Sequence, residues 1–254
     1  MKRRIRRVPR LGKPAVALSL TIIALLTAGA VVFHRVGRAI WYPVYRSVAG
    51  SLTVEDVLRE YGPAAEQRLR PSFVQAGLPY PPARVTLLVF KQEKVLEFWA
   101  EGNGRRAFVR SYPILAASGR AGPKLREGDR QVPEGIYQII ALNPNSSYHL
   151  SMQVDYPNRF DREKAAGEGR TNLGGEIFIH GKAVSIGCIA VGDEAIEELF
   201  CLVARVGAPH VKVIIAPSDL RRGPAVADLA TEPRWVPELY ARLAAELRAF
   251  PPRQ

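Results

Sequence analysis

The chain has 254 residues and a formal net charge of +12, but its basic residues are unevenly distributed. Residues 1–50 contain 10 lysines and arginines and no acid, which leaves 26 basic and 24 acidic residues in the remainder. A domain this close to neutral lacks the basic face that nucleic acids require, so we exclude a nucleic-acid partner. The remainder is long enough for one domain with a substantial core.

The N-terminal segment predicts a membrane anchor. Residues 1–13 form a basic tail, and residues 14–33 form an uncharged run of 20 residues, enough to cross a hydrocarbon core of about 30 Å. The excess of cations before this run is expected to keep the N-terminus in the cytoplasm and the main domain outside it. A cleaved signal peptide, with Ala28-Gly29-Ala30 as its cleavage site, is the alternative, but apolar signal cores usually span about 7–15 residues.

Residues 34–80 are interpreted as a neck between the anchor and the main domain. The stretch "TVEDVLREY" (53–61) opens with a Thr-x-x-Asp helix start and repeats apolar residues at helical spacing. The pair Gly62-Pro63 is expected to end this helix. We expect the helix to pack on the domain that follows.

The main domain, residues 81–219, has a strand-like pattern and predicts a mostly β, β-rich α+β fold. The clearest alternation is "YHLSMQVDY", which places His149 on the polar face of its strand. The strands are expected at 85–91, 95–101 (a hairpin with the first), 105–115, 136–142, 148–156, 175–180 and 210–217. Helices are expected at 193–206 and at 236–249, the latter an amphipathic helix after a linker within residues 220–254.

The stretch "EIFIHGKAVSIGCIAVGDEAIEELF" (176–200) concentrates residues that can carry chemistry. A cysteine thiolate is a strong nucleophile, and a nearby histidine can take its proton and later protonate the leaving amine. His180 at a strand end and Cys188 on the returning chain are therefore candidates for a general base and a nucleophile. Backbone N–H groups near Gly187 and Cys188 can stabilise an oxyanion.

Other interpretations of Cys188 were weighed. A disulfide with Cys201 is disfavoured, because the apolar stripe of helix 193–206 predicts that Cys201 lies on the opposite, polar face. An inert buried thiol is as well supported as a catalytic one by the spacing alone. A serine nucleophile at Ser185 is excluded, because Asp193 follows it too closely and no helix comes directly after the serine. The scattered histidines and the lack of paired cysteines predict no metal site.

Resemblance to a known family favours the catalytic interpretation. The stretch "IHGKAVSIGCIAVGD" resembles the signature of the L,D-transpeptidase catalytic domain (YkuD type), in a sub-branch with a His-Gly-x-x-x-Ser-x-Gly-Cys-x-Ala motif. The stretches "EGDRQVPEGIYQI" and "LNPNSSYHLSMQVDYPN" are similar to further segments of that family. The resemblance implies a β-sandwich or barrel with edge helices. It also implies that Cys188 is the nucleophile, that His180 is the general base, and that Ser185 and Gly187 shape the loop that supplies oxyanion donors.

The resemblance also implies a substrate class. It predicts a cysteine enzyme that acts on the stem peptides of peptidoglycan without a cofactor, anchored in the bacterial inner membrane with its domain in the periplasm. Cross-linking is the first expectation. A related hydrolase that cleaves cross-links or detaches a wall-linked lipoprotein is an alternative, and a non-catalytic wall-binding module is a second one. Residues 161–175 are expected to form a loop that helps to select the acceptor.

The chain also departs from the commoner family pattern. Ile186 stands where that pattern has a second histidine, and Ala190 stands where it has Arg or Asn. What orients the imidazole of His180 is therefore left open. His149 and Tyr156 are the candidate substrate-binding residues.

Overall fold

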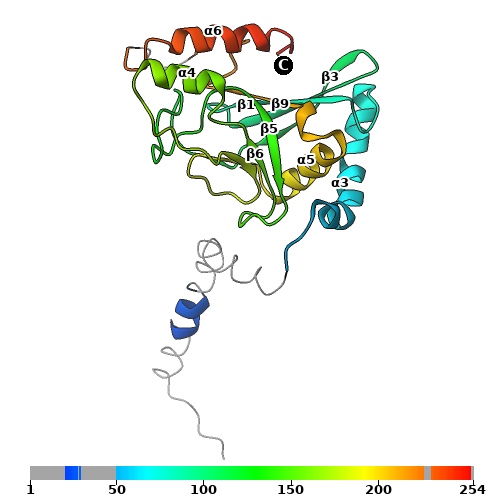
Figure 1. Ribbon diagram of the computed structural model, residues 1–254. Coiled ribbons are helices and arrows are strands. Elements are labelled where there is room, and N and C mark those ends of the chain that lie inside the picture. Colours follow the sequence, from blue (N-terminus) through cyan, green and yellow to red (C-terminus); the bar gives the residue numbers. More distant parts are fainter. Residues whose placement is uncertain (1–20, 28, 30–49, 226–229, 253–254) are drawn as a thin grey trace, which may run out of the picture. The chain divides into compact units, whose positions relative to one another are not determined.

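The computed structural model describes residues 21–27, 29, 50–225 and 230–252 in two units, residues 1–50 and 51–254 (Figure 1). Most of the predicted anchor and the whole basic tail lie outside the described residues. Residues 21–27 and 29 are helical. Within the described part of the chain, no helix is both long enough and apolar enough to span a bilayer. The anchor therefore stays a prediction.

A mixed sheet of nine strands lies at the centre of the second unit, in the order β3-β2-β1-β9-β5-β6-β7-β8-β4. Its strands are β1 (Arg84–Phe90), β2 (Val95–Gly102), β3 (Arg105–Pro113), β4 (Ala116–Ala117), β5 (Gly135–Asn143), β6 (Ser151–Val154), β7 (Phe178–His180), β8 (Ile189–Ala190) and β9 (Val211–Ala216). The pairs β1–β9 and β7–β8 are parallel, and the other neighbours are antiparallel. The β-rich class is confirmed, but a two-sheet sandwich is not.

The two edges of this sheet come close together. The edge strands β3 and β4 are consecutive in the chain and are joined only by Ile114 and Leu115. Ile114 donates its N–H to the Lys94 carbonyl at 2.7 Å, and Leu115 donates to the Ala190 carbonyl at 2.8 Å. The sheet must therefore curl into a half-barrel, and the short link between β3 and β4 holds its two edges near each other.

The predicted strands are confirmed with shorter bounds in places. The hairpin of β1 and β2 forms as expected. The predicted strand 148–156 is reduced to β6, because the chain turns before Ser151 and His149 adopts a left-handed φ of 78°. Strands β4 and β8 were not predicted, since each has two residues, too few for a periodic pattern.

The first helix is longer than predicted. Helix α3 (Val54–Ala76) continues through Pro63 and Pro71, so the expected end at Gly62-Pro63 is wrong. A proline inside a helix costs about 3 kcal/mol, but each fully buried large apolar side chain contributes about 1.5–3 kcal/mol. Helix α3 buries Leu69 and Phe73 against the main core, and this burial offsets the prolines. The predicted neck helix therefore belongs to the same unit as the sheet.

The other helices cover the two faces of the sheet. Helix α5 (Asp193–Val206) packs in the larger core, and α6 (Val236–Leu247) packs in a second core on the opposite face (Figure 1). Helix α4 (Arg159–Gly167) lies where a loop was expected over residues 161–175. Its start is fixed by a capping box in which Asn158 and Asp161 each accept the other's backbone N–H.

The polar face of α5 on which Cys201 was expected is buried rather than open to solvent. Cys201 and Glu198 are both fully buried, because α3 covers the side of α5 that faces away from the sheet. The Glu198 carboxylate accepts hydrogen bonds from Arg68 at 2.7 Å, Arg110 at 2.7 Å and the Tyr112 hydroxyl at 2.8 Å. Both cysteines are free, so no disulfide joins them.

Candidate active site

The register of β7 and β8, continued by one residue before β8, brings His180 and Cys188 to the same face of the sheet. In the parallel β7–β8 pair His180 lies beside Ala190, and continuing this register by one residue places Phe178 beside Cys188. Residues two apart in a strand share a face, and their diagonal neighbours on the next strand lie about 7–8 Å away. The opposite face holds core residues, namely Met152, Ile179 and Ile189. The two predicted catalytic side chains are therefore diagonal neighbours on the non-core face.

The imidazole of His180 is fixed by two contacts that the sequence did not reveal. Its Nδ1 lies 2.6 Å from the Gly181 carbonyl oxygen, and its ring centroid lies 4.8 Å from that of Tyr148. A carbonyl only accepts, so the neutral imidazole carries its proton on Nδ1 and leaves Nε2 as a base. His180 is 2% exposed, and this burial lowers the pKa of His180 below its usual value, partly opposed by the Gly181 carbonyl.

Gly181 is required by close packing at this point. A Cβ on Gly181 would lie 2.6 Å from Asp193 Oδ1 and 2.7 Å from the Tyr148 carbonyl oxygen. Asp193, at the start of α5, also accepts the Lys182 N–H at 2.9 Å and forms an ion pair with the Lys182 side chain. The His-Gly pair therefore lets the chain pass closely between α5 and the segment before β6.

The thiol of Cys188 lies next to the segment that leads into β7. Its Sγ donates to the Glu176 carbonyl at 3.7 Å, and no hydrogen bond joins it to His180 among the described residues. Burial raises the pKa of Cys188, and the Phe178 N–H and the Lys124 cation partly oppose that rise. A lowered histidine pKa and a raised cysteine pKa favour a neutral pair.

Two hydroxyl groups hold the loop before the nucleophile. Gly187 has a φ of 99°, a left-handed conformation that favours glycine, and donates its N–H to Ser118 Oγ at 2.6 Å. Cys188 donates its N–H to Ser185 Oγ at 3.1 Å, and Ser185 Oγ donates to the Cys188 carbonyl at 2.5 Å. Both expected oxyanion donors are thus aligned by hydroxyl acceptors, which an incoming oxyanion must displace.

Ser118 is a site residue that sequence analysis missed. In the antiparallel β4–β8 pair Ala116 lies opposite Ala190, and continuing this register places Ser118 opposite Cys188. The separation of 69 residues between Ser118 and Gly187 carries no local signal. Ser118 is identified as a site residue by the pairing of β4 with β8, which the sequence did not predict.

The two candidate substrate-binding residues have other contacts. His149 Nε2 lies 2.9 Å from Glu197 Oε1, and its ring packs edge-on to Tyr61 at 5.3 Å. Tyr156 is 4% exposed, and its hydroxyl lies 3.3 Å from the Lys124 carbonyl and 3.2 Å from the Leu173 carbonyl. Within the described part of the chain, neither residue is hydrogen-bonded to His180 or Cys188, so their role as substrate contacts stays a prediction.

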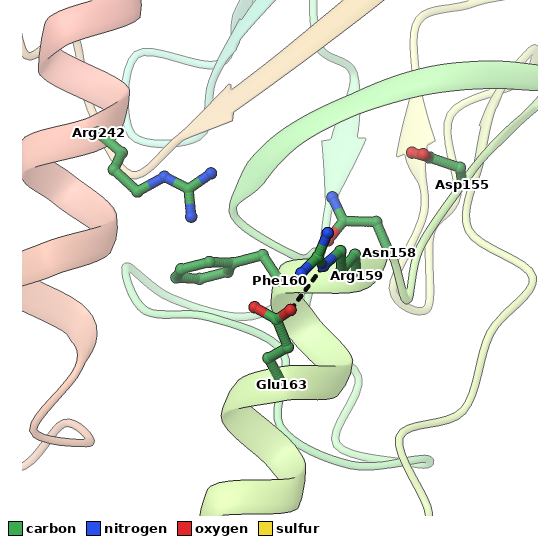
Figure 2. Close-up of a pocket in the computed structure, with 6 residues that line it drawn as sticks. All are labelled: Asp155, Asn158, Arg159, Phe160, Glu163 and Arg242. Carbon is green, nitrogen blue, oxygen red and sulfur yellow. Dashed lines mark hydrogen bonds and ion pairs between the residues drawn. The ribbon is translucent and has the colours of Figure 1, made fainter.

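Among the cavities that open to solvent, two bear on the site. The larger, of about 480 Å³, lies at the start of α4, where Arg242 of α6 packs 4.4 Å from the Phe160 ring and Arg159 pairs with Glu163 (Figure 2). It contains none of the predicted catalytic residues. The smaller, of about 280 Å³, lies beside β4 and is lined by Ser118. No cluster of potential metal ligands occurs in the part of the chain that the structure describes.

Comparison with known families extends the sequence resemblance. A profile of the L,D-transpeptidase catalytic domain (YkuD) matches residues 84–215, just over half of the chain. A curated protein of Escherichia coli strain K12, named "Putative L,D-transpeptidase YafK", is 36% identical over 138 residues. That match covers 52% of this chain and 54% of the relative. The chain thus spans about half the length of the curated relatives it matches.

Solved structures give weaker likenesses. The helical cell shape determining protein Pgp2 from Campylobacter jejuni has a TM-score of 0.44 and 24% identity, covering 53% of this chain and 48% of that chain. L,D-transpeptidase 1 from Mycobacterium tuberculosis has a TM-score of 0.32 and 13% identity, covering 52% of this chain and 62% of that chain.

Proposed function

Because the chain belongs to the L,D-transpeptidase catalytic domain family, we propose that it is a cysteine acyltransferase acting on peptidoglycan stem peptides. The observation that supports this proposal is the β7–β8 register, which brings Cys188 and His180 to one face of the sheet when it is continued by one residue before β8. The free Nε2 of His180 and the aligned amides of Gly187 and Cys188 support it further.

In the first half-reaction, Cys188 Sγ attacks a carbonyl carbon of the stem peptide while its proton passes to His180 Nε2. The carbonyl oxygen becomes an oxyanion, which the N–H groups of Gly187 and Cys188 stabilise in place of their hydroxyl acceptors. The C–N bond then breaks, the imidazolium gives its proton to the leaving amine, and a thioester remains on Cys188.

The acceptor decides the outcome of the second half-reaction. His180 removes a proton from the incoming nucleophile, which attacks the thioester carbonyl. The C–S bond then breaks, and the imidazolium returns the proton to Cys188 Sγ to restore the thiol. An amine acceptor gives a cross-link, and water gives a free carboxylate. The first part of the predicted acceptor loop belongs to α4, so only residues 168–175 remain irregular. This segment precedes Glu176, whose carbonyl contacts the thiol, and it is the part of the loop that can select the acceptor.

Product analysis tests the proposal. The full-length protein is incubated with purified wall fragments, and the soluble products are identified by mass. We expect new cross-links with the wild type and none with Cys188→Ala, while Cys201→Ala remains active because Cys201 is buried between helices. Released stem peptides or a released lipoprotein would identify the hydrolase instead. If neither the wild type nor any variant formed new products from the wall fragments, this result would contradict an enzymatic role and favour a wall-binding module.

We also propose that residues 14–33 anchor the protein in the inner membrane and that the catalytic domain lies in the periplasm. The uncharged run and the cations before it support this topology. Peptidoglycan as the substrate would require it.

A further inference from the structure

We propose that the cavity of about 280 Å³ beside β4 binds a carboxylate of the peptide substrate. This inference rests on the proposed function, because it assigns a recognition site to the same peptide. The cavity lies between the turn that joins β1 to β2 and the segment that leaves β4.

The cavity is within reach of the nucleophile. Ser118 lines it and also accepts the N–H of Gly187, the residue before Cys188. Neighbouring strands lie about 4.8 Å apart, so the wall of the cavity is about one strand spacing from Cys188. An extended peptide advances about 3.3–3.6 Å per residue. A substrate with its reacting carbonyl at Cys188 can therefore place a carboxylate in the cavity from a residue one or two positions away.

The charge of the lining favours an anion. Among the described residues, three cationic residues and no acidic residue line the cavity, the cations being Lys91, Lys94 and Arg120. The larger cavity differs in this respect, because it includes the carboxylates of Asp155 and Glu163. A carboxylate is the anionic group that peptides carry, and both Lys and Arg side chains bind it through charge-assisted hydrogen bonds.

The three cations are not equally available. Lys91 is buried and already donates to Glu134 Oε1 at 2.9 Å and to two backbone carbonyls at 3.0 Å. Lys94 is exposed and, among the residues that the structure describes, makes no ion pair. Arg120 uses Nη1 for Glu232 and for the Ala121 carbonyl, which leaves Nε and Nη2 for a second carboxylate. Lys94 is therefore the primary ligand, and Arg120 the second one.

Binding without turnover tests this assignment. In the full-length chain, Cys188→Ala removes the nucleophile, and titration calorimetry then measures affinity for a stem tetrapeptide with free carboxylates. The same peptide with its carboxylates amidated is the matched ligand. We expect amidation to raise Kd about tenfold, the loss typical of a hydrogen bond to a charged group. Adding Lys94→Gln should raise Kd for the free peptide by a similar factor and leave the amidated peptide unaffected.

Arg84→Gln is the matched control, because Arg84 is an exposed cation at the opposite end of β1 from the cavity. It should leave both Kd values unchanged. Equal affinity for the two peptides, no binding of either, or an equal effect of Lys94→Gln and Arg84→Gln would overturn the assignment. Carboxylate-dependent binding without any acylation of the wild type would instead contradict the proposed function and leave the cavity assignment intact.

Discussion

At the residue scale, the site depends on backbone groups as much as on side chains. The Gly181 carbonyl sets the tautomer of His180, and the Glu176 carbonyl accepts a hydrogen bond from the Cys188 thiol. The sequence singled out both side chains as candidates, and the family resemblance favoured the catalytic interpretation over an inert thiol. The sequence could not show what orients the imidazole, because every residue has a backbone carbonyl and only the fold determines which one contacts the ring.

The pH dependence of acylation should reflect the burial of His180. The base acts only when it is neutral, so the rate should rise with pH through the pKa of His180 and then level off. Burial lowers this pKa, so we expect the midpoint below the ordinary histidine value of about 6.5. His180→Ala should lower the rate about 10²–10⁴-fold and remove this rise.

The measurement is the rate of Cys188 labelling by a stem-peptide substrate between pH 4 and pH 9. His210→Ala is the control, because His210 is exposed and lies next to β9. It should keep both the rate and the profile of the wild type. A wild-type midpoint clearly above 6.5, or an unimpaired His180→Ala variant, would show that another group takes the proton.

Ser118 should affect catalysis through the loop that it holds. Ser118→Ala removes the acceptor of the Gly187 N–H, so the loop loses one hydrogen bond that aligns it. Because the oxyanion later replaces Ser118 as the acceptor, the effect comes from the alignment of the loop before attack. We expect acylation to slow about five- to tenfold, the kinetic equivalent of about 1 kcal/mol. Ser118→Thr keeps the hydroxyl and should restore most of the rate. Ser111→Ala, at an exposed position of β3, is the control for serine removal and should have no effect.

At the element scale, α5 was predicted correctly in its bounds but not in its surroundings. Its amphipathic pattern places Ile196, Leu199 and Phe200 in the core, as the structure has them. The pattern could not show that α3 packs on the other side, because α3 was expected to end before it could cover α5. Helix α4 begins with a sequence signal, the Asn158–Asp161 capping box. The segment that follows is mostly polar and has no apolar periodicity, so the sequence did not predict this helix.

The contact between α3 and α5 should depend on Glu198. Glu198→Ala removes the carboxylate shared by Arg68, Arg110 and the buried Tyr112 hydroxyl. Because both arginines keep partial exposure, we expect a loss of about 2–3 kcal/mol in the free energy of unfolding. Urea unfolding gives this value. Glu194→Ala, one turn earlier and largely exposed, should cost less than about 0.5 kcal/mol. Equal losses for the two variants would contradict a structural role for Glu198.

At the scale of the whole molecule, the site exists because the sheet curls. The link from β3 to β4 carries Ser118 from one edge of the sheet to the other, where it meets the nucleophile loop. Local patterns predicted most strands and the β-rich class, since alternation is a property of neighbouring residues. They could not predict the strand order or the short strands β4 and β8, which depend on contacts between distant segments. The family resemblance was confirmed over residues 84–215.

The most direct test of the account is the identity of the residue that becomes acylated. The full-length protein is mixed with a stem peptide, quenched in acid and analysed by intact and peptide mass. We predict one added acyl group, located on the peptide that contains Cys188, in the wild type and in Cys201→Ala, and none in Cys188→Ala. An acyl group on any other residue, or undiminished acylation of Cys188→Ala, would contradict the assignment of Cys188 as the nucleophile.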